Sequence, residues 1–379
     1  MTTAAEARTV RITGLRLTDF RNHAHARVAI DAGTVVIVGD NGAGKTNFIE
    51  AISYLSPGRG LRRAQLAEVA RVGGSGGWAV AADVSGAVGD VRIGTGLVAG
   101  DTLRQVRIDT VLQKTSDILS EHLRVMWLTP AMDGLFSGPA ADRRRFLDRL
   151  VMSLDPAHGR RVVAFEQALT RRNRLLEDHR ADPAWLDAVE AQIVDLAVAV
   201  AAARRETVAC LARLVDEGRS EDEIFPAAGL ALEGDLERAL DAASAAEVED
   251  WYARDLASCR SRDRAAGRTL VGPHRADLAV RHRAKDMPAA LSSTGEQKAL
   301  LIGLVLAHAR LVRDLAAMTP VLLLDEITAH LDPVRREALA GLLDRLGAQA
   351  FLTGTDAAMF TPFSGAQVLH AASGQISVL

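Results

Sequence analysis

The pattern of apolar and polar positions predicts a chain with sheet-forming ends and a helical middle. Three largely apolar runs are typical of short strands buried on both faces: 34–38, 321–324 and 349–353. Turns that contain Gly, Ser or Asp separate three further strand-like runs and predict an antiparallel subsheet: 78–84, 90–97 and 103–108. Apolar and polar residues alternate over 10–19, which predicts an edge strand.

The middle of the chain, from about 116 to 265, has the composition and spacing of helices. Two long helical runs, 157–180 and 184–217, are separated by Arg180-Ala181-Asp182-Pro183, which predicts an antiparallel helical hairpin. Sheet-like sequence returns at 278–281, where apolar and polar residues again alternate.

A helical run at 296–315 follows, and the chain closes with a predicted hairpin around Ser373-Gly374. We therefore expect an α/β fold, with a mixed sheet and an antiparallel subsheet, assembled from residues 1–115 and 265–379. Residues 116–264 would be a mostly helical insertion domain.

Composition narrows the class of protein. The chain has 379 residues and a formal net charge of -3, so a nucleic-acid partner would have to bind a local patch. Cys210 and Cys259 are too few and too distant in sequence for a disulfide framework. Neither a signal peptide nor a run of eighteen apolar residues occurs, and we expect a cytoplasmic protein without membrane segments.

The segment from Gly39 to Thr46 matches the phosphate-binding pattern G-x-x-x-x-G-K-[ST] at every fixed position. An apolar run precedes it and an amphipathic helical pattern follows, which disfavours a plain glycine-rich turn. Lys45 is expected to reach the β- and γ-phosphates of a nucleotide, and the Thr46 hydroxyl to bind Mg²⁺. The predicted phosphate-binding residues are Gly39, Asp40, Asn41, Gly42, Ala43, Gly44, Lys45, Thr46 and Asn47.

The apolar run 321–324 ends in Asp325 and Glu326. A phosphate loop needs a carboxylate to hold Mg²⁺, and Asp325 is placed for that role, with Thr46 as the second metal ligand. Glu326 is then placed to polarise an attacking water. Glu326, Asp325 and Lys45 are the predicted catalytic residues for hydrolysis of ATP.

A serine and a glycine precede the next helical run, in Ser293-Thr294-Gly295-Glu296. This segment resembles the signature motif of ABC-type ATPases in its SMC-like form, and the alternative is a helix N-cap with Glu in the first turn. The resemblance implies an ABC/SMC-like P-loop ATPase head that dimerises around two ATP molecules, each bound by Ser293, Gly295 and Glu296 of the other copy. Asp332 matches the D-loop at the same interface. The γ-phosphate sensor is either Thr353 or Thr355, and Thr355 is included among the nucleotide-binding residues.

Within that class the chain resembles the RecF family of bacterial recombination proteins over nearly its full length. The matching segments, beyond the ATPase motifs, are Asp19-Phe20-Arg21-Asn22, Gly58-Arg59-Gly60-Leu61-Arg62-Arg63, Arg143-Arg144-Arg145-Phe146-Leu147-Asp148 and Gly272-Pro273-His274-Arg275-Ala276-Asp277. The resemblance adds Arg21 and Asn22 to the nucleotide-binding residues. It also implies ATP-dependent binding of double-stranded DNA near single-stranded gaps, weak DNA-stimulated ATP hydrolysis, and cooperation with RecR and RecO to load RecA.

Six arginines are candidates for DNA phosphate contacts: Arg59, Arg62, Arg63, Arg143, Arg144 and Arg172. The alternative for each is ordinary surface charge. Two alternative functions predict other sequence features. A transporter nucleotide-binding subunit would have Gln in the signature and His at the sensor, and an ATPase-coupled nuclease would need a further acidic metal-binding domain.

Overall fold

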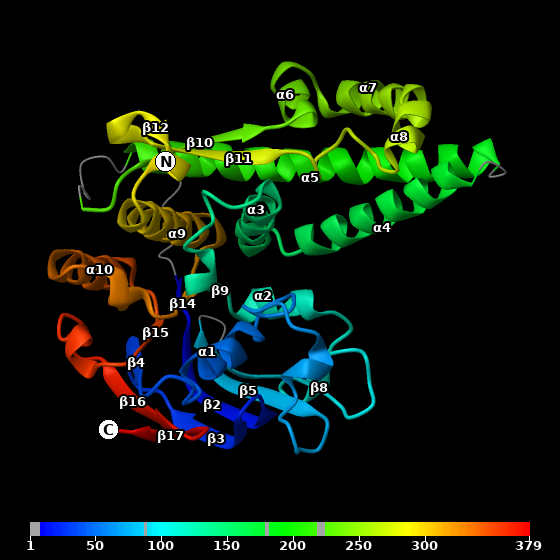
Figure 1. The fold of residues 1–379 in the computed structure, drawn as a ribbon. Coiled ribbons are helices and arrows are strands. Elements are labelled where there is room, and N and C mark those ends of the chain that lie inside the picture. Colours follow the sequence, from blue (N-terminus) through cyan, green and yellow to red (C-terminus); the bar gives the residue numbers. More distant parts are fainter. Residues whose placement is uncertain (1–7, 87–88, 179–181, 218–223) are drawn as a thin grey trace. The chain divides into compact units, whose positions relative to one another are not determined.

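The structure, a computed structural model, describes residues 8–86, 89–178, 182–217 and 224–379. It forms two compact units (Figure 1). The first takes the chain up to Asp133 and again from Thr294 to Leu379, and the second takes most of Gly134 to Ser293. Both ends of the chain therefore build one unit, but the divisions lie at 133/134 and 293/294 rather than at the predicted 115/116 and 264/265.

The centre of the first unit is a six-stranded sheet in which five strands are parallel. Its order is β17 (Gln375–Val378), β16 (Gln367–Ala372), β4 (Thr34–Val38), β15 (Ala350–Gly354), β14 (Val321–Leu324) and β9 (Val125–Leu128). The helices of this unit are α1 (Lys45–Ser53), α2 (Leu119–His122), α9 (Thr294–Ala316) and α10 (Pro333–Leu346). β1 (Arg8–Thr9) pairs with β13 (Met318–Thr319) in a separate two-stranded ladder.

The second sheet of this unit is antiparallel, as predicted for residues 78–108. Its order is β3 (His23–Ala29), β2 (Arg11–Phe20), β5 (Trp78–Gly86), β6 (Gly89–Leu97), β7 (Gln105–Ile108) and β8 (Val111–Leu112). Along these strands apolar residues alternate with others, and the apolar ones share one face of the sheet. That face packs into a core that also contains Phe48, Ile49 and Ile52 of α1. Because this core includes residues of both sheets, it fixes α1 and the loop before it.

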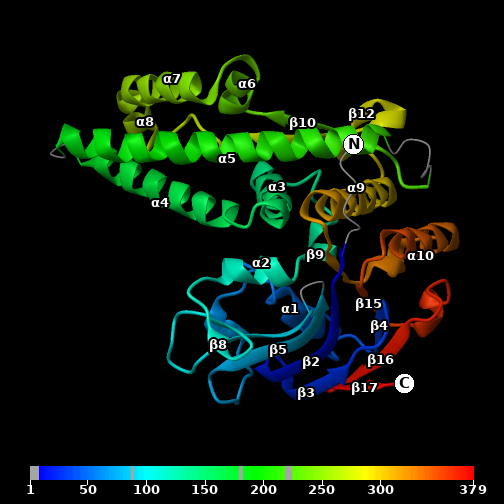
Figure 2. The same cartoon turned by 180° about the vertical axis from the view of Figure 1, so that it is seen from behind.

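The second unit is mostly helical. Its helices are α3 (Ala140–Leu154), α4 (His158–Glu177), α5 (Pro183–Glu217), α6 (Asp235–Ala242), α7 (Ala245–Ser258) and α8 (Arg260–Ala266). Figure 2 shows from behind that α4 and α5 lie side by side, as the predicted hairpin requires. Residues 180 and 181 of the predicted connection lie outside the described residues. The core joins Phe165 and Leu169 of α4 to Ile193 and Ala197 of α5 and Tyr252 of α7.

Three strand predictions were wrong. β2 is internal, between β3 and β5, rather than an edge strand. The region predicted to be helical contains two strands, β9 and β10 (Ala228–Glu233). The Ala, Leu and Glu of β10 favour a helix, but this segment forms a strand because it pairs with β11 (Asp277–His282). β11 also pairs with β12 (Met287–Pro288), so this segment belongs to the second unit and not to the head.

No helix in the described part of the chain is long and apolar enough to span a membrane.

Candidate nucleotide site

The phosphate loop joins the end of β4 to the start of α1, at the carboxyl edge of the parallel strands. Its backbone needs glycine at two positions. Gly39 has φ 147° and Gly44 φ 113°, conformations that L side chains rarely adopt. A Cβ on Gly39 would lie 2.2 Å from the Ala371 carbonyl oxygen, and one on Gly44 would lie 2.7 Å from Asn22 Nδ2.

The C-terminal hairpin supports this loop from below. The backbone N–H of Gly374, at the tip between β16 and β17, donates to the Ala43 carbonyl at 3.2 Å. His23 is buried with Nδ1 2.7 Å from the Gly374 carbonyl and Nε2 3.3 Å from the Gly44 carbonyl. Burial lowers the pKa of His23 despite these contacts. The end of the chain therefore helps to shape the phosphate loop, a role that the sequence did not predict.

Lys45 is buried in the first turn of α1. Its Nζ donates to the carbonyl oxygens of Gly39 and Asp40 at 2.7 and 2.9 Å. The ammonium group is thus held over the phosphate loop by the loop's own backbone, in reach of an anion bound there.

The predicted metal ligands come together. Thr46 Oγ1 lies 3.0 and 3.2 Å from the two carboxylate oxygens of Asp325, which follows β14. Burial, together with the neighbouring Glu326 carboxylate, raises the pKa of Asp325 despite the hydrogen bonds that it accepts. Hydroxyl and carboxylate oxygens are the ligands that Mg²⁺ takes from proteins, so this pair fits the cation that the motif implies.

Thr353, at the end of β15, fixes both acidic residues. Its hydroxyl donates to Asp325 Oδ1 at 2.7 Å and accepts the backbone N–H of Glu326 at 3.0 Å. Glu326 has φ 51°, an uncommon conformation for a residue with a side chain, so its backbone needs such support. Of the two threonines that the sequence offered as sensor, the structure brings Thr353 into the site, whereas Thr355 is exposed.

We expect Thr353→Val to reduce ATP turnover by at least about tenfold with little change in KM. A hydrogen bond to a charged group is worth about 1.5–3 kcal/mol, and about 1.4 kcal/mol in a barrier is a factor of ten in rate. Steady-state kinetics measures this, with Thr353→Ser as the matched control that keeps the hydroxyl. Wild-type turnover in Thr353→Val would exclude a positioning role.

Arg21 and Asn22 contact the phosphate loop and α1. Asn22 Nδ2 donates to the Ala43 carbonyl at 3.2 Å, and Asn47 Nδ2 donates to Asn22 Oδ1 at 2.7 Å. Arg21 forms a two-bonded pair with the fully buried Glu50 at 2.7 and 2.9 Å. Burial alone would lower the pKa of Arg21, but the Glu50 carboxylate raises it above its usual value.

Arg62 belongs to the same cluster. Its Nη1 donates to Asn47 Oδ1 at 2.6 Å and to Glu50 Oε2 at 2.5 Å. Its positive charge also acts to lower the pKa of Asp325, although burial keeps the net shift upward. Arg62 thus lies beside the nucleotide site with its side chain 41% exposed, and Arg59 and Arg63 are exposed as well, so all three stay predicted DNA contacts.

The signature residues lie at a helix start. Thr294 begins α9, and Ser293 and Gly295 are exposed there, with Glu296 partly exposed in the first turn. A Cβ on Gly295 would meet no atom within 4 Å. Asp332 is exposed and caps α10 by accepting the Arg335 N–H at 2.9 Å. None of these residues takes part in the contacts described above for Lys45, Thr46 and Asp325.

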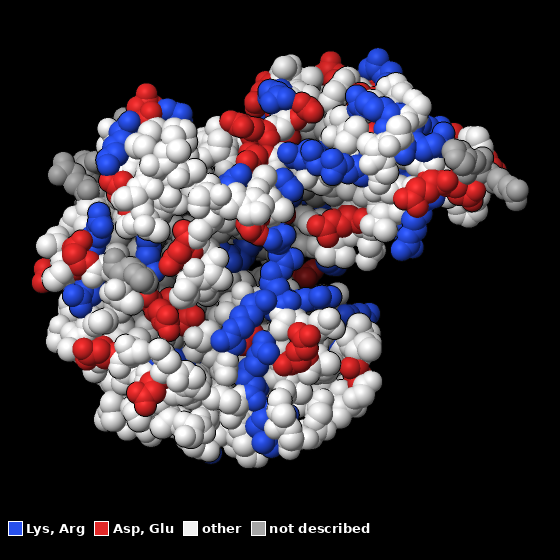
Figure 3. Space-filling view, viewed as in Figure 1, with Lys and Arg blue, Asp and Glu red and all other residues white. Residues whose placement is uncertain are grey.

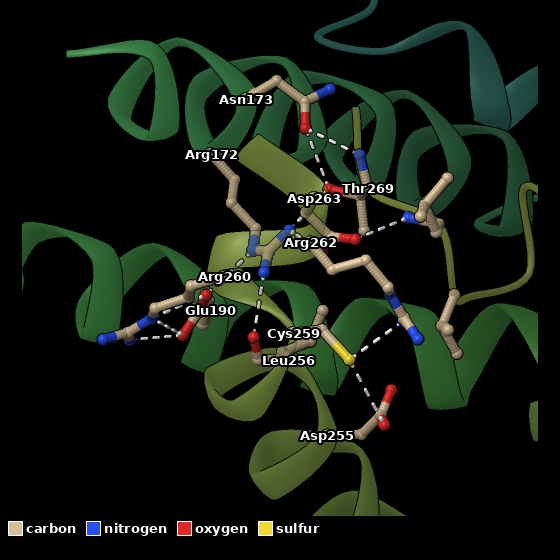
Figure 4. A network of polar contacts seen from close by, with 12 residues as sticks. Arg172, Asn173, Glu190, Asp255, Leu256, Cys259, Arg260, Arg262, Asp263 and Thr269 are labelled. Atoms are coloured by element: carbon tan, nitrogen blue, oxygen red, sulfur yellow. Dashed lines mark hydrogen bonds and ion pairs between the residues drawn. The ribbon is translucent and has the colours of Figure 1, made fainter. Parts of the chain in front are cut away.

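The structure contradicts the DNA assignment of Arg172, because this side chain is fully buried in the second unit. It donates to Glu190 and Asp263 at 2.8 and 2.7 Å, and also to Thr269 Oγ1 and the Leu256 carbonyl (Figure 4). Every face of the guanidinium is occupied, so Arg172 holds α4, α5 and α8 together and cannot meet DNA.

We expect Arg172→Ala to lower the free energy of unfolding by about 3–5 kcal/mol, since it leaves Asp263 buried without its cation. Chemical denaturation measures this. Arg171→Ala is the matched control, because Arg171 is the exposed neighbour on the same helix and should change stability by less than about 0.5 kcal/mol. Equal stability of the two variants would contradict the buried network.

Arg143 and Arg144 are also engaged within the second unit. Arg143 pairs with Asp277 through two bonds of 2.7 Å, and Arg144 Nη1 donates to the Ala276 carbonyl at 2.8 Å. Arg204 donates to both carboxylate oxygens of Asp148 and to the Pro273 carbonyl. The two most family-specific segments, 143–148 and 272–277, thus pack on each other, and Arg143 and Arg144 hold them together.

The fold and site define a P-loop ATPase head of the SMC-like, ABC-type class. The model of the RecF/RecN/SMC N terminal domain family matches residues 11–375. The chain is 55% identical over 370 residues to the DNA replication and repair protein RecF of Rhizobium johnstonii, covering 97% of this chain and 98% of that one. The chain therefore belongs to the RecF family.

Solved structures agree with this fold. A structure of the recombination mediator protein RecF of the RecFOR pathway, in its RecF-ATPrS form, matches with a TM-score of 0.87 at 20% identity and covers 99% of this chain and 100% of that chain. An SMC head bound to the C-winged helix domain of ScpA matches with a TM-score of 0.56 at 16% identity, over 97% and 96% of the two chains. Both structures share the fold over nearly the whole chain, and the TM-score is higher for RecF.

Proposed function

We propose that the chain is an ATP-dependent DNA-binding protein of recombinational repair and replication-fork maintenance. The observation that carries this proposal is the convergence of Thr46 and Thr353 on Asp325, beside the phosphate loop of a RecF-family chain. ATP and Mg²⁺ are its cofactors, with Lys45 on the phosphates and Thr46 and Asp325 as metal ligands. Glu326 takes the proton of the attacking water.

ATP acts as a switch for dimerisation. The exposed Ser293 and Gly295 lie at the start of α9, where the positive end of the helix dipole suits the γ-phosphate bound by a second copy. The exposed Asp332 lies at the same interface. Slow, DNA-stimulated hydrolysis then separates the two copies.

The dimer closes on double-stranded DNA near single-stranded gaps. RecR is the expected direct partner, and RecO and RecA are expected to take part indirectly. The description of the similar RecF structure as part of the RecFOR pathway supports this. The protein acts in the cytoplasm. A transporter subunit is not favoured, because the chain is related to RecF over 97% of its length. A nuclease is not supported either, since the described residues hold no cluster of three or more acidic, His or Cys side chains for a metal.

A salt series tests this function. The protein would be titrated against duplex, single-stranded and gapped DNA with and without ATP and Mg²⁺, and log affinity plotted against log salt. We expect tighter binding with ATP and a preference for DNA that contains duplex. Affinity for DNA that ATP does not change would overturn the switch.

A further inference from the structure

The outward face of the antiparallel sheet carries a row of arginines that the nucleotide site does not use. In the strand register, Arg27 of β3 lies opposite Arg16 of β2, Arg16 opposite Ala81, Ala81 opposite Gly94 and Gly94 opposite Arg107 of β7. The row therefore crosses five strands, with arginine on both sides and only small residues between. Arg27 and Arg107 are exposed, and Arg16 is partly exposed.

This face is positively charged although the chain as a whole is not. Its outward positions hold five arginines and two aspartates: Arg11, Arg16, Arg27, Arg92, Arg107, Asp83 and Asp90. Arg16 and Arg92 share Asp83 through bonds of 2.8 and 2.7 Å. The remaining arginines are in excess. Figure 3 shows a line of Lys and Arg side chains on the face of the molecule that it presents.

Arg16 and Arg27 lie directly across from each other, and like charges in that position destabilise a sheet. The pair therefore costs the sheet some stability, which the bond from Arg16 to Asp83 partly offsets. A polyanion placed over the row would turn this cost into a favourable interaction, because the guanidinium fork matches the geometry of phosphate oxygens.

The shape of the face favours duplex over single-stranded nucleic acid. Ala79, Ala81, Gly94 and Gly96 form a low floor between the arginines. With strands about 4.8 Å apart, the three strand spacings from Arg16 to Arg107 span about 14 Å, comparable to the roughly 12 Å width of a major groove. Among the described outward positions of β2, β3, β5, β6 and β7 there is no Phe, Tyr or Trp on which unpaired bases could stack.

We propose that this arginine face binds the phosphate backbone of double-stranded DNA, and that it does so without ATP. All of its residues belong to the first unit and none contacts the phosphate loop in the bonds described above. The proposal rests on the DNA-binding function proposed above, but it adds a second contact surface that does not depend on dimerisation. The protein would hold duplex DNA weakly before ATP closes the dimer.

The test uses full-length protein without nucleotide and a blunt 30-base-pair duplex, with affinity measured by fluorescence anisotropy over a salt series. We expect Arg27→Ala/Arg107→Ala to reduce the slope of log affinity against log salt by about 2, since each lost phosphate contact removes about 0.9. ATP turnover and the thermal unfolding midpoint should stay at wild-type values, because neither residue contacts the site or the core.

Gly94, at the centre of the face, allows a matched pair of variants that differ in charge. A Cβ on Gly94 would contact only Arg107, at 3.9 and 4.0 Å, so Gly94→Gln should fold and bind, whereas Gly94→Glu should repel the phosphates and weaken binding about tenfold. Unchanged duplex affinity and slope in the folded variants would overturn the proposal. Polyglutamate serves as a probe for an acidic protein partner. Variants that keep their affinity for duplex DNA but lose binding to polyglutamate would also overturn the proposal, because the partner would then be an acidic protein.

The outcomes also separate this proposal from the function on which it rests. A wild-type protein that binds duplex only with ATP would overturn the arginine face alone. A protein that binds no DNA in either nucleotide state would overturn both.

Discussion

Lys45→Ala is expected to bind ATP about 30- to 3,000-fold more weakly than the wild-type protein. Its ammonium group is buried above the phosphate loop, where two loop carbonyls hold it. Removing one partner of a buried, hydrogen-bonded charge pair costs about 2–5 kcal/mol, and about 1.4 kcal/mol corresponds to a factor of ten in affinity. Isothermal titration with ATP and Mg²⁺ measures this.

Lys114→Ala provides the control for this variant, because Lys114 is an exposed lysine of the same unit and should leave the affinity unchanged. ATP binding of normal strength in folded Lys45→Ala would show that the glycine loop is only a turn between β4 and α1.

Glu326→Gln is expected to keep ATP binding but to hydrolyse ATP about 100- to 10,000-fold more slowly, the usual contribution of a general base. The side chain stays the same size, and the backbone bond from Glu326 to Thr353 is untouched. The ATP-bound form should therefore accumulate. Single-turnover kinetics gives the rate of the chemical step directly.

The matched control is Glu337→Gln, which changes an exposed glutamate on α10 and should leave hydrolysis at the wild-type rate. Turnover within about threefold of wild type in Glu326→Gln would assign the proton transfer to another group.

The sequence predicted the nucleotide site well because its motifs are local. The phosphate loop matches a pattern of eight consecutive residues, and Asp325 follows an apolar strand directly. Lys45, Thr46 and Asp325 lie together as predicted, since the carboxyl ends of parallel β4 and β14 share one edge of the sheet.

Thr353 shows what register adds to a local motif. The sequence left the sensor open between Thr353 and Thr355, but Leu324 pairs with Leu352, so that Thr353 is the next residue opposite Asp325. A prediction of which strand neighbours β14 could have found it, but that neighbour lies 26 residues further along the chain and is fixed only by the fold.

The DNA-binding arginines could not be predicted in the same way. Whether an arginine is exposed depends on distant acids, as with Arg172, whose partner Asp263 lies 91 residues away. Conversely, the arginine face joins residues from five strands that no sequence motif connects. Strand pairing across the sheet, rather than charge runs along the chain, produces that surface.

The central claim is that ATP joins two copies of this chain around DNA. Sedimentation velocity of Glu326→Gln with a labelled gapped duplex, with and without ATP and Mg²⁺, tests it most directly. We predict two copies per duplex with ATP, and no such complex with a Glu326→Gln/Ser293→Arg variant, because arginine would block the exposed start of α9. A single copy on the duplex in the presence of ATP would contradict the claim.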